Sequence, residues 1–123
     1  MFEIEVYQKK SGKSPLEDYI SSLSKQSRDA EIASIFYYID MLKEYGLAIN
    51  NVHPQAARLI RDDIYELRPG KNRVFFFTFE GNNIILLHAY RKESQKAPEH
   101  EIEKAISEMN DYKRRYGNGQ NDF

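Results

Sequence analysis

The middle of the chain gathers residue types that together can cut RNA. The chain as a whole has 18 Lys and Arg against 19 Asp and Glu, a net charge of -1, but its central third is locally basic. In RNA strand scission the ribose 2′-OH is the nucleophile. The protein then has to position the phosphate, move protons and stabilise charge on the phosphorane, and this reaction needs no metal.

Arginines and lysines are the candidate phosphate-binding residues. Arg73 and Arg68 can each offer a fork of donors to phosphate oxygens, and Lys92 or Arg91 can add a further positive charge. Tyr90 could stack on a base or donate its hydroxyl. The residues expected to bind RNA rather than to act in catalysis are Arg58, Arg61, Lys71, Tyr90, Arg91 and Lys96.

Glu66 and His88 are the candidates for proton transfer. Glu66 is the available carboxylate base, and His88 is of the residue type that can serve as base or acid near neutral pH. Each has a structural alternative. Glu66 could form a surface ion pair with Arg68 or Arg61, worth about 0–1 kcal/mol; His88 could be a hydrogen-bonded core histidine; and Arg73 could be a surface residue at a strand end.

The composition narrows the possible classes of protein. A chain of 123 residues fits one domain, expected over residues 1–116, with a disordered tail at 117–123. It has no cysteine and only three histidines, far apart in the sequence, so neither a metal site nor another cofactor is expected. Residues 1–7 lack the pattern of a signal peptide, and no stretch suits a membrane span, so the expected location is the cytoplasm.

The first part of the chain predicts one strand followed by a two-helix hairpin. Residues 2–7 alternate between apolar and charged side chains, which is typical of a strand. A capping box at residues 14–17, with proline at the first helical position, starts a short helix. A second helix, with Ser24 or Ser27 as its cap, should end at Gly46.

The second part predicts a β-meander and a final helix. Residues 50–54 read as a loop, and Pro98 starts a helix with acids in its first turn. The predicted strands are Ala57–Arg61, Ile64–Arg68, Arg73–Phe79 and Asn83–Lys92. The predicted apolar stripe of the last helix is Ile102, Ala105, Ile106, Met109 and Tyr116. The sequence therefore predicts an α+β protein whose mostly antiparallel sheet is built in the order βααββββα.

Strand register predicts which side chains share a face. If residues 81–82 form a two-residue turn, Arg73 pairs with Tyr90. Period-two alternation then places His88 and Lys92 on the same face and Arg91 on the other. The other pairs expected in this hairpin are Phe79 with Ile84, Phe77 with Leu86, and Phe75 with His88. A turn at residues 62–63 pairs Arg61 with Ile64, Leu59 with Glu66 and Ala57 with Arg68, and clusters Arg61, Glu66 and Arg68.

Four pieces of sequence occur in an order that resembles the RelE/HigB-like toxins of bacterial toxin–antitoxin modules. They are Tyr65-Glu66-Leu67-Arg68, Arg73 entering an aromatic strand, Leu86-Leu87-His88-Ala89-Tyr90-Arg91-Lys92, and Gln95-Lys96-Ala97-Pro98. The resemblance covers nearly the whole chain. It implies a RelE-like fold and a catalytic role for Arg73, and it matches the Arg91-Lys92 pair to the basic pair that ends the corresponding strand in relatives.

The resemblance also implies a function and partners. The expectation is a phage-related, HigB-like mRNA endoribonuclease that acts on translated message at the ribosome and inhibits translation and growth. A helix–turn–helix, HigA-like antitoxin should neutralise it, and operator DNA should be bound only through that antitoxin. The alternatives are a ParE-like poison of DNA gyrase and a module that only binds its partner.

The sequence is compatible with two alternative docking surfaces for the antitoxin. The antitoxin could cover the basic cluster with acidic residues. It could instead dock on the helical hairpin, residues 15–46, because Tyr37, Tyr38 and Tyr45 exceed what the hydrophobic stripe of the second helix needs and tyrosine is enriched at interfaces.

Overall fold

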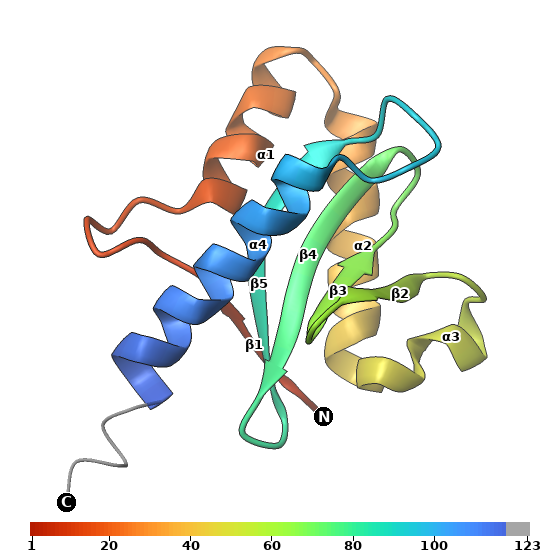
Figure 1. The fold of residues 1–123 in the computed structure, drawn as a ribbon. Coiled ribbons are helices and arrows are strands. Elements are labelled where there is room, and N and C mark those ends of the chain that lie inside the picture. Colours follow the sequence, from red (N-terminus) through yellow and green to blue (C-terminus); the bar gives the residue numbers. More distant parts are fainter. Residues whose placement is uncertain (118–123) are drawn as a thin grey trace, which may run out of the picture.

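The computed structural model describes residues 1–117 (Figure 1). Its elements, in chain order, are β1 (Glu3–Val6), α1 (Pro15–Lys25), α2 (Asp29–Tyr45), a 3-10 turn (Gly46–Ala48), α3 (Ile49–Val52), β2 (Ala57–Arg61), β3 (Ile64–Leu67), β4 (Asn72–Phe79), β5 (Asn83–Arg91), α4 (Glu99–Tyr112) and a π-helical turn (Lys113–Gly117). The predicted tail at residues 118–123 lies outside the described residues, and Gly117 belongs to the π-helical turn.

The five strands form one sheet in the order β1-β5-β4-β3-β2. β1 runs parallel to β5, and the other neighbouring strands pair antiparallel, so the sheet is mixed. The predicted α+β class is confirmed. The predicted element order lacked α3, which forms within the stretch read as a loop.

Helices cover both faces of the sheet, with α4 on one face and α1 and α2 on the other (Figure 1). The core between the sheet and the α1–α2 layer includes Leu23, Leu42 and Phe76. The core under α4 includes Phe75 and Met109. Adjacent residues of β4 therefore pack into different layers, which explains why residues 72–77 are all buried.

Local signals start and end the first two helices. The Ser14 hydroxyl accepts a hydrogen bond from the Glu17 backbone N–H at 3.2 Å, as the capping box predicted. The predicted caps of α2 are wrong, because Arg28 is its N-cap and makes no side-chain capping bond. Gly46 ends α2 at a positive φ of 58°; a Cβ there would clash with the ring of Phe2, so this position requires glycine.

Two β-bulges change the predicted register. The β4–β5 loop has three residues rather than two, so Phe79 pairs with Asn83, one residue earlier than predicted. A bulge in β5 opposite Phe75 adds one residue and restores the predicted pair of Arg73 with Tyr90. The predicted pairing of Phe77 with Leu86 is therefore wrong, and Phe77 pairs with Ile85.

The β2–β3 hairpin contains the second bulge. Arg61 pairs with Ile64 as predicted, but an extra residue between Leu59 and Arg61 shifts the rest of the strand. Glu66 consequently pairs with Arg58 instead of Leu59. The same shift replaces the predicted pair of Ala57 and Arg68 by Ala57 with Leu67.

The apolar stripe of the last helix follows the prediction up to the point where the α-helix gives way to the π-helical turn. Ile102, Ala105 and Met109 are buried, and Tyr112 continues the stripe. The predicted member Tyr116 is 51% exposed. It lies in the π-helical turn, where the wider spacing rotates the later side chains away from the α-helical stripe. No helix among residues 1–117 is long and apolar enough to cross a membrane.

Candidate functional site

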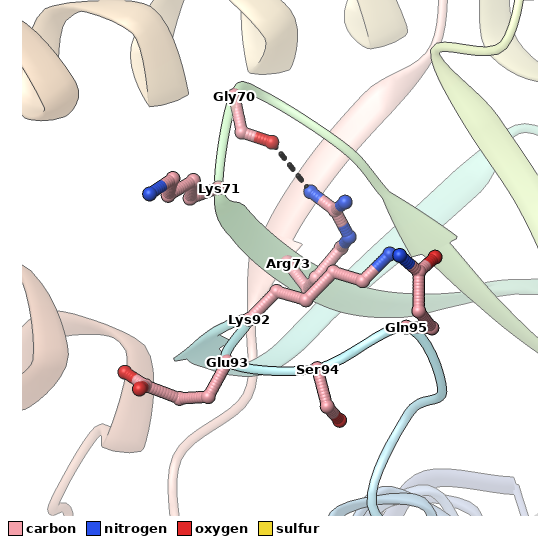
Figure 2. Close-up of a pocket in the computed structure, with 7 residues that line it drawn as sticks. All are labelled: Gly70, Lys71, Arg73, Lys92, Glu93, Ser94 and Gln95. Atoms are coloured by element: carbon pink, nitrogen blue, oxygen red, sulfur yellow. Dashed lines mark hydrogen bonds between the residues drawn. The ribbon is translucent and has the colours of Figure 1, made fainter.

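An open cleft of about 530 Å³ lies where the β3–β4 turn meets the loop after β5 (Figure 2). It is lined by Gly70, Lys71, Arg73, Lys92, Glu93, Ser94 and Gln95. The pairing of Arg73 with Tyr90 brings the turn and the loop together, and the Lys92 backbone N–H donates to the Lys71 carbonyl at 2.7 Å. The sheet therefore fixes the position of the cleft's two walls relative to each other.

Arg73 is built into the wall of the cleft. Its side chain is 8% exposed, and Nη1 donates to the Gly70 and Asn72 carbonyls at 2.7 and 2.9 Å. Its Nε lies 3.7 Å from Glu66 Oε1. Burial lowers the pKa of Arg73, and the Glu66 carboxylate opposes that shift. The alternative of a surface arginine at a strand end is wrong, because the side chain is buried and bonded to the carbonyl of Gly70 in the turn.

Glu66 does not line the cleft but forms an ion pair with Arg73 inside the protein. Glu66 is 2% exposed, accepts a hydrogen bond from the Tyr90 hydroxyl at 3.2 Å, and lies 4.0 Å from Arg68 Nε. Burial raises the pKa of Tyr90 above its usual value, so the hydroxyl stays a donor. The Tyr90 ring stacks on Phe75 with centroids 5.6 Å apart, and the residue is only 8% exposed, so it is not available to stack on an RNA base.

Lys92 provides a second cation beside Arg73. In Figure 2 its side chain extends next to the Arg73 guanidinium and toward the Gln95 amide, while Lys71 and Glu93 point away from this pair. Within residues 1–117, neither Lys92 nor Lys71 forms an ion pair. The cleft therefore presents positive charge that the described protein does not neutralise.

Arg91 faces the opposite side of the sheet. Its Nε and Nη2 donate to Glu31 of α2 at 3.2 Å, so of the two basic residues left open by the sequence, Lys92 faces the cleft. Asn72 also donates to Glu31, at 2.9 Å. These hydrogen bonds, first that of Arg91, then those of Asn72 and Arg28, lower the pKa of Glu31 from 4.5 to about 2.

Removing the Glu31 charge should therefore weaken the protein in a pH-dependent way. A carboxyl whose folded-state pKa is lowered stabilises the protein above its unfolded pKa, and this contribution is lost as the pH falls from about 4.5 to about 2. We expect Glu31→Gln to cost on the order of 1–2 kcal/mol at pH 7, discounted for partial exposure. Urea unfolding at several pH values should show the difference from the parent shrinking below pH 4.5. Glu103→Gln, on the exposed side of α4, is the control that should show no such trend.

His88 lies under α4 and not in the cleft. It is 2% exposed, with Nδ1 2.8 Å from Glu108 Oε1 and Nε2 2.9 Å from Glu101 Oε1. Its ring also packs against Phe75, with centroids 5.1 Å apart. This geometry matches the alternative of a hydrogen-bonded core histidine, because both ring nitrogens are already engaged by carboxylates.

The other predicted RNA-binding residues gather at a second hollow. This hollow, of about 300 Å³, lies between β2 and the start of α4 and is lined by Arg58, Leu59, Ile60, Arg61, Lys96, Ala97, Glu99 and Ile102. Arg61 forms a two-pronged pair with Glu99, so it does not join Glu66 and Arg68 as expected. Arg58 and Lys96 have no ion-pair partner in the described part of the chain.

Sequence reasoning missed part of the cleft wall. Gly70, Glu93, Ser94 and Gln95 line the cleft, but none was assigned a role. Glu93, Ser94 and Gln95 follow Lys92 directly, so the available signal was adjacency in a short loop before a helix. Gly70 contributes a backbone carbonyl, which no residue type reveals.

Comparison with known proteins places the chain in a family. It belongs to the family of phage derived, Gp49-like proteins (DUF891), whose family model matches residues 18–110. This family is associated with toxin–antitoxin systems and is of the RelE/HigB type, so an antitoxin partner is implied. No curated protein matched the sequence. The matched range contains β2 to β5, most of α4 and the whole cleft.

Proposed function

We propose that this protein is a HigB-like toxin that cuts mRNA at the cleft between the β3–β4 turn and the loop after β5. The observation that carries the proposal is the unpaired Lys92 beside the fixed guanidinium of Arg73. Membership of a toxin–antitoxin-associated family supports it. The message is its substrate, and the translating ribosome presents that message.

Electrostatics favour an anion in this cleft. Two cations side by side repel each other, and a phosphate between them converts that repulsion into two charge-assisted hydrogen bonds. Arg73 keeps one terminal nitrogen bonded to backbone carbonyls, which fixes the plane of the guanidinium. Its remaining terminal nitrogen and the Lys92 ammonium can then bind the phosphate oxygens.

The same groups suit cleavage by the neighbouring 2′-OH. As the 2′-oxygen attacks phosphorus and the bond to the 5′-oxygen breaks, negative charge grows on the phosphorane oxygens. Arg73 and Lys92 stabilise that charge, and the ammonium of Lys92 can donate a proton to the leaving 5′-oxygen. His88 and Glu66 are buried, so neither takes the 2′-OH proton, which passes instead to solvent water in the open cleft. Catalysis here rests on positioning and charge.

The partners follow from the charge distribution. RNA affinity depends on neutralised phosphates, and with a net charge of -1 only local basic surfaces can supply it. The hollow with Arg58 and Lys96 is the second such surface and extends contact along message or ribosomal RNA. A helix–turn–helix antitoxin neutralises the toxin and carries it to operator DNA.

Expression of the chain without its antitoxin tests this proposal. Growth should stop, and primer extension on a reporter message should show new 5′ ends within the coding region. Lys92→Ala should lower cleavage by about tenfold to 100-fold, because it removes a cation from the transition state without removing a buried contact. Lys104→Ala, an exposed lysine on α4, should cleave like the parent. Intact message together with double-strand DNA breaks would instead identify a gyrase poison.

A further inference from the structure

An apolar surface remains exposed on the outer side of the helical layer. We name it the α2–α3 patch: Phe36, Tyr37, Tyr45, Leu47 and Val52, which are 37–59% exposed. The sheet-facing side of α2 is already filled by Ile35 and Leu42, both fully buried. The exposed rings therefore contribute nothing to the core, and large aromatic side chains left in water are typical of an interface.

A hollow of about 450 Å³ opens inside this patch between α2 and α3. It is lined by Tyr37, Asp40, Met41, Glu44, Tyr45, Val52 and His53. One wall is held in place, because the Tyr38 hydroxyl lies 3.0 Å from His53 Nε2 and the two rings pack with centroids 4.9 Å apart. Tyr37 packs edge-on against Tyr38, with centroids 6.1 Å apart.

The hollow carries negative charge that the described protein leaves unpaired. Asp40 and Glu44 lie one helical turn apart, both exposed, and neither forms an ion pair or a side-chain hydrogen bond within residues 1–117. Like charges at this spacing destabilise a helix by about 0.2–0.5 kcal/mol. By contrast, Glu31 on the same helix binds Arg28, Asn72 and Arg91. The two unpaired acids therefore give the hollow a negative charge that can bind a cation.

We infer that the hollow receives an arginine or lysine side chain of the antitoxin, and that apolar neighbours of that residue pack on Phe36 and Tyr37. Asp40 and Glu44 would bind the charged group, and the faces of Tyr37 and Tyr45 would cover its stem. The inference rests on the proposed toxin–antitoxin function. Nucleic acid does not fit this surface, because its phosphates would be repelled by the two carboxylates.

This dock is separate from the cleft. The two sites share no lining residue, and Figure 1 shows α3 at the lower right while the loop between β5 and α4 lies at the upper right. An antitoxin seated on the patch alone therefore leaves Arg73 and Lys92 uncovered. Our inference takes the second of the two surfaces left open by the sequence: the dock on the helical hairpin recruits the antitoxin, and any block of the cleft needs a second contact.

The cation site can be tested with a small probe. Nuclear magnetic resonance titration with N-acetyl-arginine amide should shift the signals of Tyr37, Asp40, Glu44 and Tyr45. The neutral isostere N-acetyl-citrulline amide should not, and Asp40→Asn with Glu44→Gln should abolish the arginine response. Equal responses to both probes, or shifts confined to residues outside the hollow, would refute a cation site.

The partner contact is tested by calorimetric titration of the purified chain with its cognate antitoxin, the partner in the proposed function. The double change Asp40→Lys with Glu44→Lys should weaken binding at least 30-fold, and Tyr37→Ala at least fivefold. Glu103→Lys, a single charge reversal on the exposed side of α4, should bind like the parent. Affinity of the double variant within threefold of the parent overturns the inference. So does self-association of the parent chain that the double variant abolishes, since a second copy would then be the occupant.

Message cleavage by the free variants separates this inference from the proposed function. The double variant should cleave RNA like the parent, because its changes lie outside the cleft. If the parent cleaves nothing while the charge-reversed variant still loses the antitoxin, the dock stands and the nuclease proposal fails. If cleavage is intact and antitoxin binding is unchanged by the double variant, the nuclease stands and the dock fails.

Discussion

Replacing Arg73 with alanine is expected to lower message cleavage by about 1000-fold and to destabilise the protein by about 2–4 kcal/mol. The first effect follows from loss of the fixed cation that, in the proposed reaction, stabilises the phosphorane. The second follows because the Gly70 and Asn72 carbonyls lose their donor, and the buried Glu66 keeps its charge with a weaker set of partners. Growth assays alone cannot separate these two effects.

Arg73→Lys separates them. A lysine keeps one positive charge near Glu66 but loses the fork that binds backbone carbonyls and phosphate together. We expect this variant to stay folded, measured by thermal unfolding, and to cleave at least 100-fold more slowly in a purified translation assay. If Arg73→Lys cleaves at the parental rate, the cleft is not the site of strand scission.

Replacing His88 with leucine is expected to cost about 3–5 kcal/mol of unfolding free energy at pH 7. Two carboxylates from α4, Glu101 and Glu108, face the two ring nitrogens, and loss of this shared histidine leaves the buried Glu108 and the partly exposed Glu101 facing each other without it. Glu108 is 5% exposed, and its Oε2 already has no hydrogen-bond partner. Detachment of α4 from the sheet is the expected structural result.

The compensating change provides the control. His88→Leu combined with Glu101→Gln and Glu108→Leu should regain most of the lost stability in urea unfolding, because removing a whole buried charged group is far less costly than removing one partner. A loss below about 1 kcal/mol for the single His88→Leu change would show that these carboxylates do not hold α4. Any loss of toxicity in this variant should track the folded fraction.

The course of the strands could be predicted from the sequence, but their exact pairing could not. Alternation and turn residues indicate where β2 to β5 run. They contain no signal for a bulge, because an inserted residue changes neither composition nor turn chemistry. Arg73 was nevertheless paired correctly with Tyr90, since the longer loop and the bulge shift the register in opposite directions.

The sequence predicted which residues belong to the candidate site better than it predicted how deeply each one is buried. Arg73 and Lys92 share the cleft, as alternation from Tyr90 required. The core alternative for His88 could be stated from the sequence, but the burial of Glu66 could not be predicted, because it depends on a long-range contact of a carboxylate on β3 with an arginine on β4. Polar residue types indicate chemistry equally well in a core or on a surface.

The position of β1 in the sheet sets the order in which the molecule can be completed during synthesis. Residues 3–6 are made first, but they pair only with residues 83–86, so the first strand waits for most of the chain. His88 is held by α4, which is made later still. Such long-range closure folds slowly and leaves the early chain unassembled. A translation product that stops before Asn83 has neither a partner for β1 nor a complete cleft, so we expect it to lack the proposed cleavage activity.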